Sequence, residues 1–342
     1  MNFFFLFLLI LILVQTISYK KLGKLINIYD LPDKKRKLHK SKTPVIGGIN
    51  IFIVILFLIF SDFFLANNST LTPNIFFEFN LITNKPEFFA LLIVTSLFFV
   101  MGLYDDKFSI NSNVKLILQI IFCTILLSID NSIRIEQLNF KINNEVISLG
   151  NFSIVFTIFC ILVFINAFNM FDGMNLQIGL YSIYLFSFFI FNQGLDYKFI
   201  FIIISLIFFS LLNFKGKIFI GNNGSYLMGF LISYMFLKLN FLFPQSFFSA
   251  DEILLLMLII GIDLVRVSFL RLKKGLNAFH PDNTHIHHIL LKKYGYSKSL
   301  MILAGIIFFP SFIYFFIFND FLIFIFTLVT LIYLFLINEK RK

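Results

Sequence analysis

Acidic residues are scarce in this chain, and the adjacent pair Asp105-Asp106 is the most suggestive for chemistry. The acidic and histidine motifs gather on the face expected to be cytoplasmic, where nucleotides and Mg²⁺ are available. The pair follows a long apolar run, which places it at the carboxyl end of a helix. That end already carries partial negative charge, so two carboxylates there are poorly placed for stability. A solvated helix end and a functional pair both stay open, and Lys115 could hold a phosphate nearby.

A second group consists of Asn166, Asn169 and Asp172, in a stretch that continues to Asn175. Spacings of three residues place these side chains on one face of a helix. Polar side chains at the end of a membrane helix are costly unless they have partners, so they indicate a site. A hydrogen-bond network that fixes the shape of the protein is the alternative.

A glycine-rich stretch, Gly221-Asn-Asn-Gly224-Ser225, could approach a phosphate. Glycines allow backbone N–H groups to come close to such a ligand, and the helix start that follows is electropositive. The signal is weak by itself, and a simple tight turn is the alternative.

Four of the five histidines fall between His280 and His288. His285 and His288 could share a zinc ion, but Asp282 is the one further ligand nearby, which does not complete a tetrahedron. Neutral-to-cationic imidazoles suit a diphosphate better.

Two other charged groups have more ordinary interpretations. Asp263 and Arg266 lie three residues apart in an apolar run, which predicts a structural ion pair inside the membrane. The segment from Asp30 to His39 is strongly basic. It is either a surface that meets a phosphate or lipid headgroup or a plain cytoplasmic anchor.

The composition restricts the elements that can position these groups. Of the 342 residues, 59% are hydrophobic and 13% are charged. Too few polar residues remain to cover a soluble core, which excludes soluble globular, disordered and secreted disulfide-rich proteins. We expect an all-α polytopic membrane protein that forms one domain over residues 1–342. Cys123 and Cys160 lie in apolar runs and are expected in the core.

The apolar runs predict about eleven transmembrane helices, because about 20 apolar residues cross a bilayer. These spans are expected near residues 3–18, 45–65, 88–104, 114–130, 151–168, 176–191, 198–213, 224–243, 251–270, 300–317 and 320–337.

Charge predicts the orientation of the spans. With the N-terminus outside and the C-terminus in the cytoplasm, 23 of the 28 Lys and Arg residues face inward. Cytoplasmic loops are rich in basic residues, so this asymmetry accounts for most of the net charge of +10 without a nucleic-acid partner. Basic residues follow the first span rather than precede it, so we expect a span and not a signal peptide. Alternation and a turn near Asn143 predict a short periplasmic β-hairpin in segment 131–150.

In order along the chain, from Asp30 to Leu290, these stretches resemble the polyprenyl-phosphate N-acetylhexosamine-1-phosphate transferase family. The bacterial branch that acts on UDP-GlcNAc and undecaprenyl phosphate looks more similar than the branch that makes the first lipid of peptidoglycan. The motifs that carry the resemblance are the paired aspartates with Lys115, the Asn-rich stretch that ends in Asp172-Gly173, and His285-Ile-His287-His288.

Two positions depart from the family pattern. Asn175 replaces the second Asp of the usual DGxDG, as it does in eukaryotic relatives. Asn222 replaces the Asp of the usual GDxGS, which in relatives binds Mg²⁺. An amide oxygen can still bind Mg²⁺ but brings no charge. The preserved Gly221, Gly224 and Ser225 argue against wholesale decay.

The resemblance implies a multi-pass enzyme of the bacterial inner membrane with its active site on the cytoplasmic face. It would transfer a HexNAc 1-phosphate, with GlcNAc 1-phosphate favoured, from a UDP-sugar to undecaprenyl phosphate. UMP would leave, and a lipid-linked cell-surface glycan such as lipopolysaccharide would begin. Membrane lipids surround such a protein, and a homodimer stays open. A catalytically degenerate paralogue that acts as a scaffold and a transporter are the alternatives; polar groups gathered at one face favour the enzyme over a transporter.

The resemblance also implies roles for individual residues. The expected catalytic pair acts on the lipid phosphate and the metal, with Lys115 as counter-charge. The metal would be Mg²⁺, with Mn²⁺ as an alternative. The expected catalytic residues are Asp105 and Asp106; the metal ligands are Asp172 and Asn222; the substrate-binding residues are Lys115, Asn169, Asn175, His285, His287 and His288.

Overall fold

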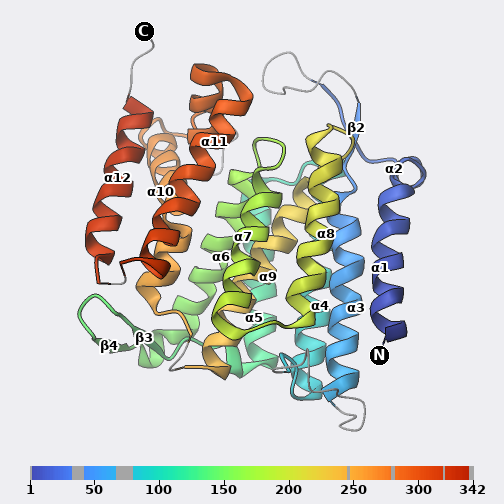
Figure 1. Ribbon diagram of the computed structural model, residues 1–342, viewed down its shortest axis with the longest axis horizontal. Helices are drawn as coiled ribbons and strands as arrows, with labels where there is room; N and C mark the ends of the chain where they lie inside the picture. The colour runs from blue at the N-terminus through green and yellow to red at the C-terminus, as the bar shows by residue number, and fades with distance from the viewer. Residues whose placement is uncertain are drawn as a thin grey trace.

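The protein is a bundle of helices in a computed structural model, which describes residues 2–32, 42–66, 80–244, 247–278, 282–318 and 320–338 (Figure 1). These ranges leave out residues 33–41, which include most of the basic segment that ends at His39, and they also leave out His280. The helices are α1 (Asn2–Ile17), α2 (Tyr19–Ile26), α3 (Gly47–Ala66), α4 (Lys85–Phe108), α5 (Ser112–Ile129), α6 (Ser153–Phe171), α7 (Gln177–Gln193), α8 (Tyr197–Phe214), α9 (Gly221–Leu242), α10 (Ala250–Lys273), α11 (Ile286–Phe316) and α12 (Leu322–Asn338).

Each of the eleven expected spans coincides with one helix, and the protein is a multi-pass membrane protein. Eight of the described helices are long and apolar enough to cross a membrane, or nine if the bent pair α1–α2 is one span. Helices α7 and α12 have 17 residues each and are shorter than a typical span. The number of eleven crossings therefore stays a prediction.

The helices begin and end at residues with recognisable capping roles. The Asn84 side chain accepts a hydrogen bond from the Glu87 N–H at the start of α4, and Pro86 lies in the first turn. Ser249 and Glu252 form a capping box at the start of α10. Helix α4 ends at Ser109, which has a positive φ of 55°. These caps fix the depth at which the residues near the helix ends stand.

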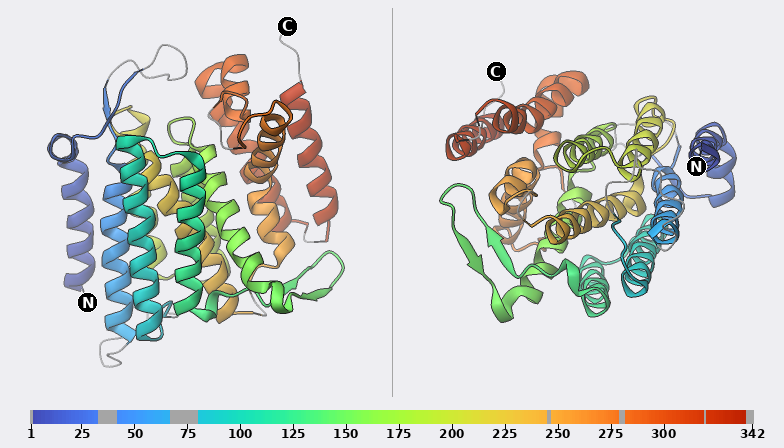
Figure 2. Two further views of the ribbon diagram at one scale, coloured as in Figure 1. Left: turned by 180° about the vertical axis from the view of Figure 1, so that it is seen from behind. Right: turned by 60° about the horizontal axis from the view of Figure 1, so that its bottom comes forward.

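Helix α9 is the centre of the bundle and the most buried of the eight candidate spans. It packs against α3, α4 and α6, and Figure 2 shows the other helices around this group. Close approach depends on glycine: a Cβ on Gly102 would stand 2.3 Å from the Asn223 Cα, and one on Gly48 would stand 2.4 Å from the Gly224 N. The start of α9 is therefore locked against α3 and α4.

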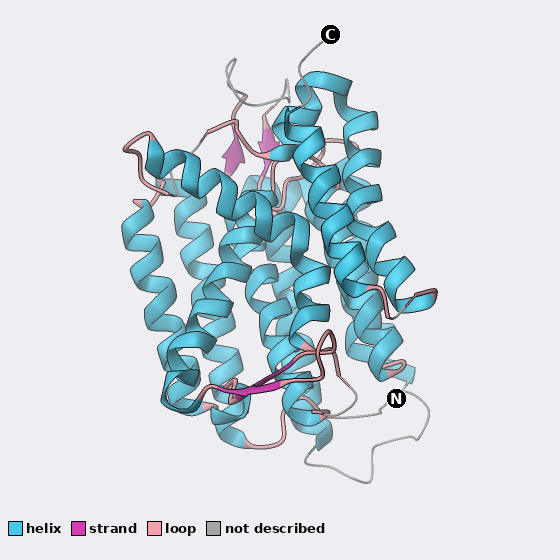
Figure 3. Ribbon diagram, turned by 90° about the vertical axis from the view of Figure 1, so that its left-hand side faces the viewer, coloured by secondary structure: helices cyan, strands magenta, loops and turns pink. Residues whose placement is uncertain are grey.

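Two short antiparallel strand pairs lie at opposite ends of the bundle (Figure 3). Strand β1 (Tyr29–Asp30) pairs with β2 (Thr43–Pro44), and Val45 bridges to Phe219 just before α9. Strand β3 (Gln137–Asn139) pairs with β4 (Val146–Ser148) in the segment where a hairpin is expected. The turn between β3 and β4 docks on α10, since the N–H groups of Lys141 and Ile142 donate to Asp251.

Buried ion pairs lie toward the end of the bundle that holds β3 and β4. Lys238 on α9 is fully buried, and its Nζ lies 2.9 Å from a Glu87 carboxylate oxygen. Lys198 is also buried, 2.9 Å from both Asp62 and Asp196. A buried charge is costly unless it is paired, so each partner depends on the other.

We expect Lys238→Ala to lower the free energy of unfolding by about 3–5 kcal/mol, because it leaves the Glu87 carboxylate buried without its cation. The melting temperature in detergent micelles measures the loss. Lys85→Ala, which removes an exposed lysine near the same end of α4, is the matched control. Equal melting temperatures for the two variants would contradict this account of the pair.

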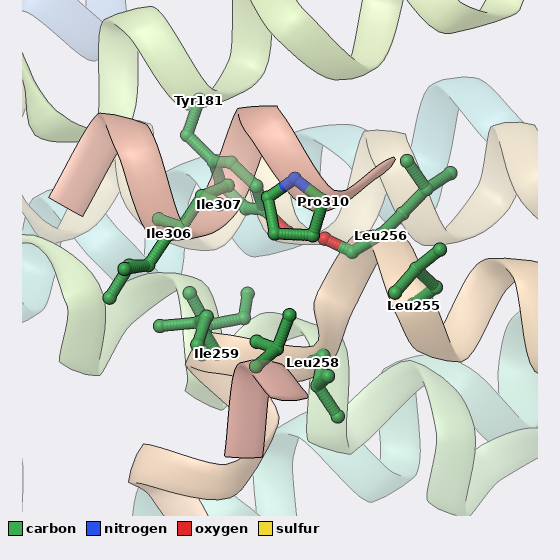
Figure 4. A pocket seen from close by; sticks show the side chains of 10 residues that line it. Tyr181, Leu255, Leu256, Leu258, Ile259, Ile306, Ile307 and Pro310 are labelled. Carbon is green, nitrogen blue, oxygen red and sulfur yellow. The ribbon is translucent and has the colours of Figure 1, made fainter. Parts of the chain in front are cut away.

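Two cavities lie away from the sequence motifs described above. A void of about 10 Å³ lies among aliphatic side chains of α10 and α11. Figure 4 shows its lining, which includes Tyr181 and Pro310. The void has room for one water at most and offers an apolar lining, so it is a packing defect. A cavity of about 200 Å³ is lined by Lys141, Glu252, Tyr314 and five further residues near the β3–β4 turn.

Candidate active site

Asp105 is a buried anchor at the carboxyl end of α4. Its carboxylate lies 2.7 Å from the Nζ of Lys115 on α5, a residue that the sequence analysis expected to meet a phosphate. It also accepts hydrogen bonds from the Ile110 N–H, at 2.8 Å, and from the Tyr226 hydroxyl of α9, at 3.2 Å. Both carboxylate oxygens are therefore used, and Asp105 ties α4, α5 and α9 together.

Asp106 caps the start of α9. Its carboxylate accepts from the N–H groups of Asn222 and Asn223, at 2.8 and 3.1 Å, and from the Asn223 side-chain amide, at 2.5 Å. A carboxylate at a helix N-terminus is well placed, because it meets unpaired N–H groups and the positive end of the dipole. The N–H groups that the Gly221 stretch was expected to offer to a phosphate are thus occupied by Asp106.

The aspartate pair has partners that the sequence analysis did not foresee. At the end of α4 alone, two negative charges are unfavourable. In the folded protein each carboxylate has three partners, and most come from α9 or α5. Asn223 and Tyr226 are site residues that the sequence analysis missed; Asn223 lies inside the glycine-rich motif, whereas Tyr226 carries no sequence signal.

The asparagines of α6 divide between the two roles that the sequence left open. The Asn169 amide donates to the Asn222 side-chain oxygen and to the Ser225 hydroxyl, at 2.9 Å each. It joins the DG stretch to the glycine-rich stretch. The Asn166 amide instead donates to Gln119 and to the Leu162 carbonyl, at 2.8 Å each, and belongs to a structural network.

Asp172 follows the last residue of α6 and is the most accessible carboxylate of the expected site. The surrounding protein, together with the negative charges of Asp106 and Asp30, raises its pKa to about 7. Desolvation by the surrounding protein is the larger cause, and Asp106 and Asp30 add to it through their negative charges. Asp30 is a further site residue that the sequence analysis noted only as the start of a basic loop.

His285 is buried and takes part in a hydrogen-bond network with Asp263 and Arg271. Its Nδ1 is 2.7 Å from Asp263, and its Nε2 is 3.1 Å from the Arg271 guanidinium. Because Arg can only donate, Nε2 accepts, and Nδ1 carries the proton that is donated to Asp263. The predicted pair Asp263–Arg266 is confirmed at 2.7 Å, and Tyr333 also donates to Asp263 at 2.7 Å.

Asp282 is bound to Arg271 and is not a metal ligand in this arrangement. Two contacts of 2.9 and 3.2 Å join the carboxylate to the guanidinium. Burial opposes ionisation, yet hydrogen bonds from Arg271 and Thr284 hold the pKa of Asp282 well below its usual range. Arg271 engages both Asp282 and His285, and among the residues that the structure describes these side chains form no zinc-binding group.

His287 meets the DG stretch, and His288 lies beside His287. His287 is buried against Gly173, where an added Cβ would stand 1.9 Å from the His287 Nε2. The rings of His287 and His288 are 4.2 Å apart, and His288 is half-buried. The backbone carbonyl of Asn175 accepts a hydrogen bond from Tyr296 of α11, at 2.9 Å. Gly173 is thus required by the close approach of α11 to this stretch.

The oxygen-rich part of the site fits a hard divalent cation. Asp106 and Asp172 offer carboxylate oxygens there, and Asn222 offers an amide oxygen that accepts a hydrogen bond from Asn169. Within the described residues, no three His, Cys, Asp or Glu side chains form a metal-binding group.

Comparisons with known proteins agree with this arrangement. The sequence profile of "Glycosyl transferase family 4" matches residues 88–240. The chain is 26% identical over 285 residues to the "Undecaprenyl-phosphate alpha-N-acetylglucosaminyl 1-phosphate transferase" of Salmonella typhi, with 80% of this chain and 71% of the relative covered. It is 26% identical to the "Probable undecaprenyl-phosphate N-acetylglucosaminyl 1-phosphate transferase" of Bacillus subtilis (strain 168), with 86% and 78% covered.

The profile match spans the aspartate pair, Lys115, the DG stretch and the glycine-rich stretch, which are the groups that the fold brings together. The matched relatives extend the similarity to at least 80% of the chain. The chain therefore resembles glycosyl transferase family 4 over residues 88–240, and together these similarities identify it as a membrane phosphoglycosyl transferase.

Proposed function

We propose that the protein transfers a HexNAc 1-phosphate, with GlcNAc 1-phosphate favoured, from a UDP-sugar to undecaprenyl phosphate and releases UMP. The reaction would take place at the cytoplasmic face of a bacterial inner membrane and begin a lipid-linked glycan. The observation that carries the proposal is the meeting of four sequence motifs at one end of the bundle, through Asp105–Lys115, Asp106–Asn222, Asn169–Ser225 and His287–Gly173. The names of the matched relatives support the acceptor and the sugar.

In the proposed reaction an oxygen of the lipid phosphate attacks the phosphorus next to the sugar. The bond from that phosphorus to the oxygen of the uridine-side phosphate breaks, and UMP leaves with the electron pair. Both reactants are polyanions, so the protein must align them and offset their charge. Bound Mg²⁺ would supply charge neutralisation, held by Asp172 and Asn222 with Asp106 beside them.

The contacts refine the expected roles. Both oxygens of Asp105 are already used, so we assign it to positioning Lys115, whose ammonium is placed to meet the lipid phosphate. Both ring nitrogens of His285 are likewise used, so it positions the loop before α11. We therefore assign binding of the diphosphate to His287 and His288, and binding of the nucleotide to the side chains of Asn169 and Asn175.

Asn222→Asp should lower the Mg²⁺ concentration for half-maximal rate by about tenfold, because a full charge at contact distance replaces an amide dipole. The wild-type protein should need unusually high Mg²⁺ or prefer Mn²⁺. Initial rates over a metal titration measure both effects. An unmoved metal curve would mean that Asn222 is not a ligand. Asn223→Asp, one residue along and buried against Asp106, is the control and should lose stability instead.

The proposed orientation predicts opposite labelling at the two ends of the bundle. A single cysteine at Asn143, in the exposed β3–β4 turn, should react with an impermeant thiol reagent in intact cells. A single cysteine at Lys273, which is exposed at the end of α10, should react only after the cells are lysed. The reverse pattern would invert the orientation.

Purified protein in proteoliposomes, with a UDP-sugar labelled in the sugar and undecaprenyl phosphate, tests the function. We expect label in the organic phase with UDP-GlcNAc. Comparison of the rates with different UDP-sugars gives the donor specificity. A folded protein that makes no lipid product with any UDP-HexNAc would favour a scaffold. Uptake of an intact donor without lipid product would favour a transporter.

A further inference from the structure

Helix α2 changes direction where the first span ends. Helices α1 and α2 are bent by 69° relative to each other, with Ser18 between them (Figure 1). Lys20, Lys21 and Lys24 are exposed in these eight residues. Three lysines in two turns cannot enter the hydrocarbon layer at acceptable cost, so α2 leaves the direction of the span.

One face of α2 is fixed to the protein. A Cβ on Gly23 would stand 2.8 Å from the Pro44 ring, so α2 lies directly on β2. Tyr19, Leu22 and Ile26 also pack against the core. The opposite arc carries the three lysines, and Leu25 stands between this arc and Leu22 on the helical wheel. The helix is therefore held in place and presents its charge outward.

The exposed side of α2 is amphipathic. Leu25 is 82% exposed and Ile17, at the bend, is 78% exposed. A helix that carries lysines beside exposed apolar residues is suited to the boundary between lipid headgroups and acyl chains. A plain cytoplasmic anchor requires the charges but not these two apolar side chains.

Neighbouring stretches add to the same charge. The Lys217 ammonium lies 5.7 Å from the Tyr19 ring centre, and the Lys42 ammonium lies 3.9 Å from that of Tyr29. Lys215 is exposed beside them. Residues 19–26, 42–44 and 215–220 contain six lysines and no acidic residue. The phosphate headgroups of anionic lipids complement such a surface.

We propose that α2 with Lys42, Lys215 and Lys217 binds the phosphate headgroups of anionic lipids, with α2 lying in the headgroup plane and Leu25 in the acyl region. This collar adjoins the strand bridge Val45–Phe219, two residues before α9 begins. It concentrates anionic lipid beside the candidate site. The proposal does not depend on the transferase activity.

A fluorophore on a cysteine at Leu25 tests the proposal locally, in a variant whose Cys123 and Cys160 are replaced by alanine. The protein is placed in phosphatidylcholine liposomes with a small fraction of spin-labelled phosphatidylglycerol or spin-labelled phosphatidylcholine. The spin label sits near the glycerol end of the acyl chain. One basic residue near the surface enriches anionic lipid by about fivefold, so we expect phosphatidylglycerol to quench at least fivefold better.

The variants make the test specific. Lys20→Gln/Lys21→Gln/Lys24→Gln should lower the quenching ratio of the two lipids, and the further replacement of Lys42, Lys215 and Lys217 by Gln should bring it close to one. Lys273→Gln/Lys274→Gln, which removes exposed charge at the end of α10, should leave the ratio unchanged. Equal quenching by both lipids in the protein with native lysines would overturn the proposal, and so would a triple variant that keeps the full preference. Absence of quenching by either lipid would show that Leu25 is outside the membrane, which also overturns it.

Discussion

Asp106→Asn is expected to reduce lipid-product formation by at least about 10³-fold, the scale of losing an essential electrostatic contact in a phosphoryl-transfer site. The variant should also be less stable. An amide offers one acceptor oxygen and two donor hydrogens, whereas Asp106 accepts three hydrogen bonds from Asn222 and Asn223. Turnover and melting temperature of the purified variant measure the two effects.

Asp130→Asn is the matched control for Asp106→Asn. Asp130 is a buried carboxylate near the other end of the bundle, and it accepts from the Ser132 N–H at 2.9 Å and from the Ser132 hydroxyl at 2.5 Å. Its replacement should lower the melting temperature with little change in turnover per folded molecule. If Asp106→Asn behaves in the same way, its role is structural and the aspartate pair is not part of the active site.

Asp172→Asn is expected to separate activity from stability. Turnover should fall by about 10²–10³-fold, because the variant loses a charged oxygen at the proposed metal position. The melting temperature without metal should hold or rise, because the change relieves repulsion from Asp106 and Asp30. Within the described residues Asp172 has no hydrogen bond that its replacement would break. Lower stability together with full activity would remove Asp172 from the site.

Taken together, the two variants distinguish the two kinds of carboxylate at this site. Asp106 holds α9 in place and faces the site, so its loss should affect both stability and activity. The folded protein disfavours the charged form of Asp172, and within the described residues Asp172 makes no hydrogen bond that would explain its presence. Groups that destabilise the fold are concentrated where function requires them.

The helices and the ends of most spans followed from apolar runs, because burial in lipid demands continuous apolar segments. The ion pair Asp263–Arg266 was also predicted from spacing and polarity. Lys115 was expected to meet a phosphate, and its ion pair with Asp105 was not predicted. The bend between α1 and α2 was not, since hydropathy reports the length of a span but not the direction in which the chain leaves it.

The partners of the site residues were the least predictable part. That Asp106 caps α9 depends on a contact across 116 positions of sequence, which requires α4 and α9 to meet at Gly102 and Asn223. That Arg271 occupies both His285 and Asp282 depends on the loop between α10 and α11. Spacing within one helix could place Asn166 and Asn169 on one face, but not show that they serve different networks.

The fate of each donor phosphate tests the central claim most directly. UDP-GlcNAc is labelled with ³²P either in the phosphate next to the sugar or in the phosphate next to uridine, and each is incubated with the protein, undecaprenyl phosphate and Mg²⁺. We predict that the first label enters the organic phase with the sugar, while the second stays in water as UMP. Sugar in the lipid without the first label, or no labelled lipid with any UDP-HexNAc so tested, would contradict the transfer of a sugar 1-phosphate.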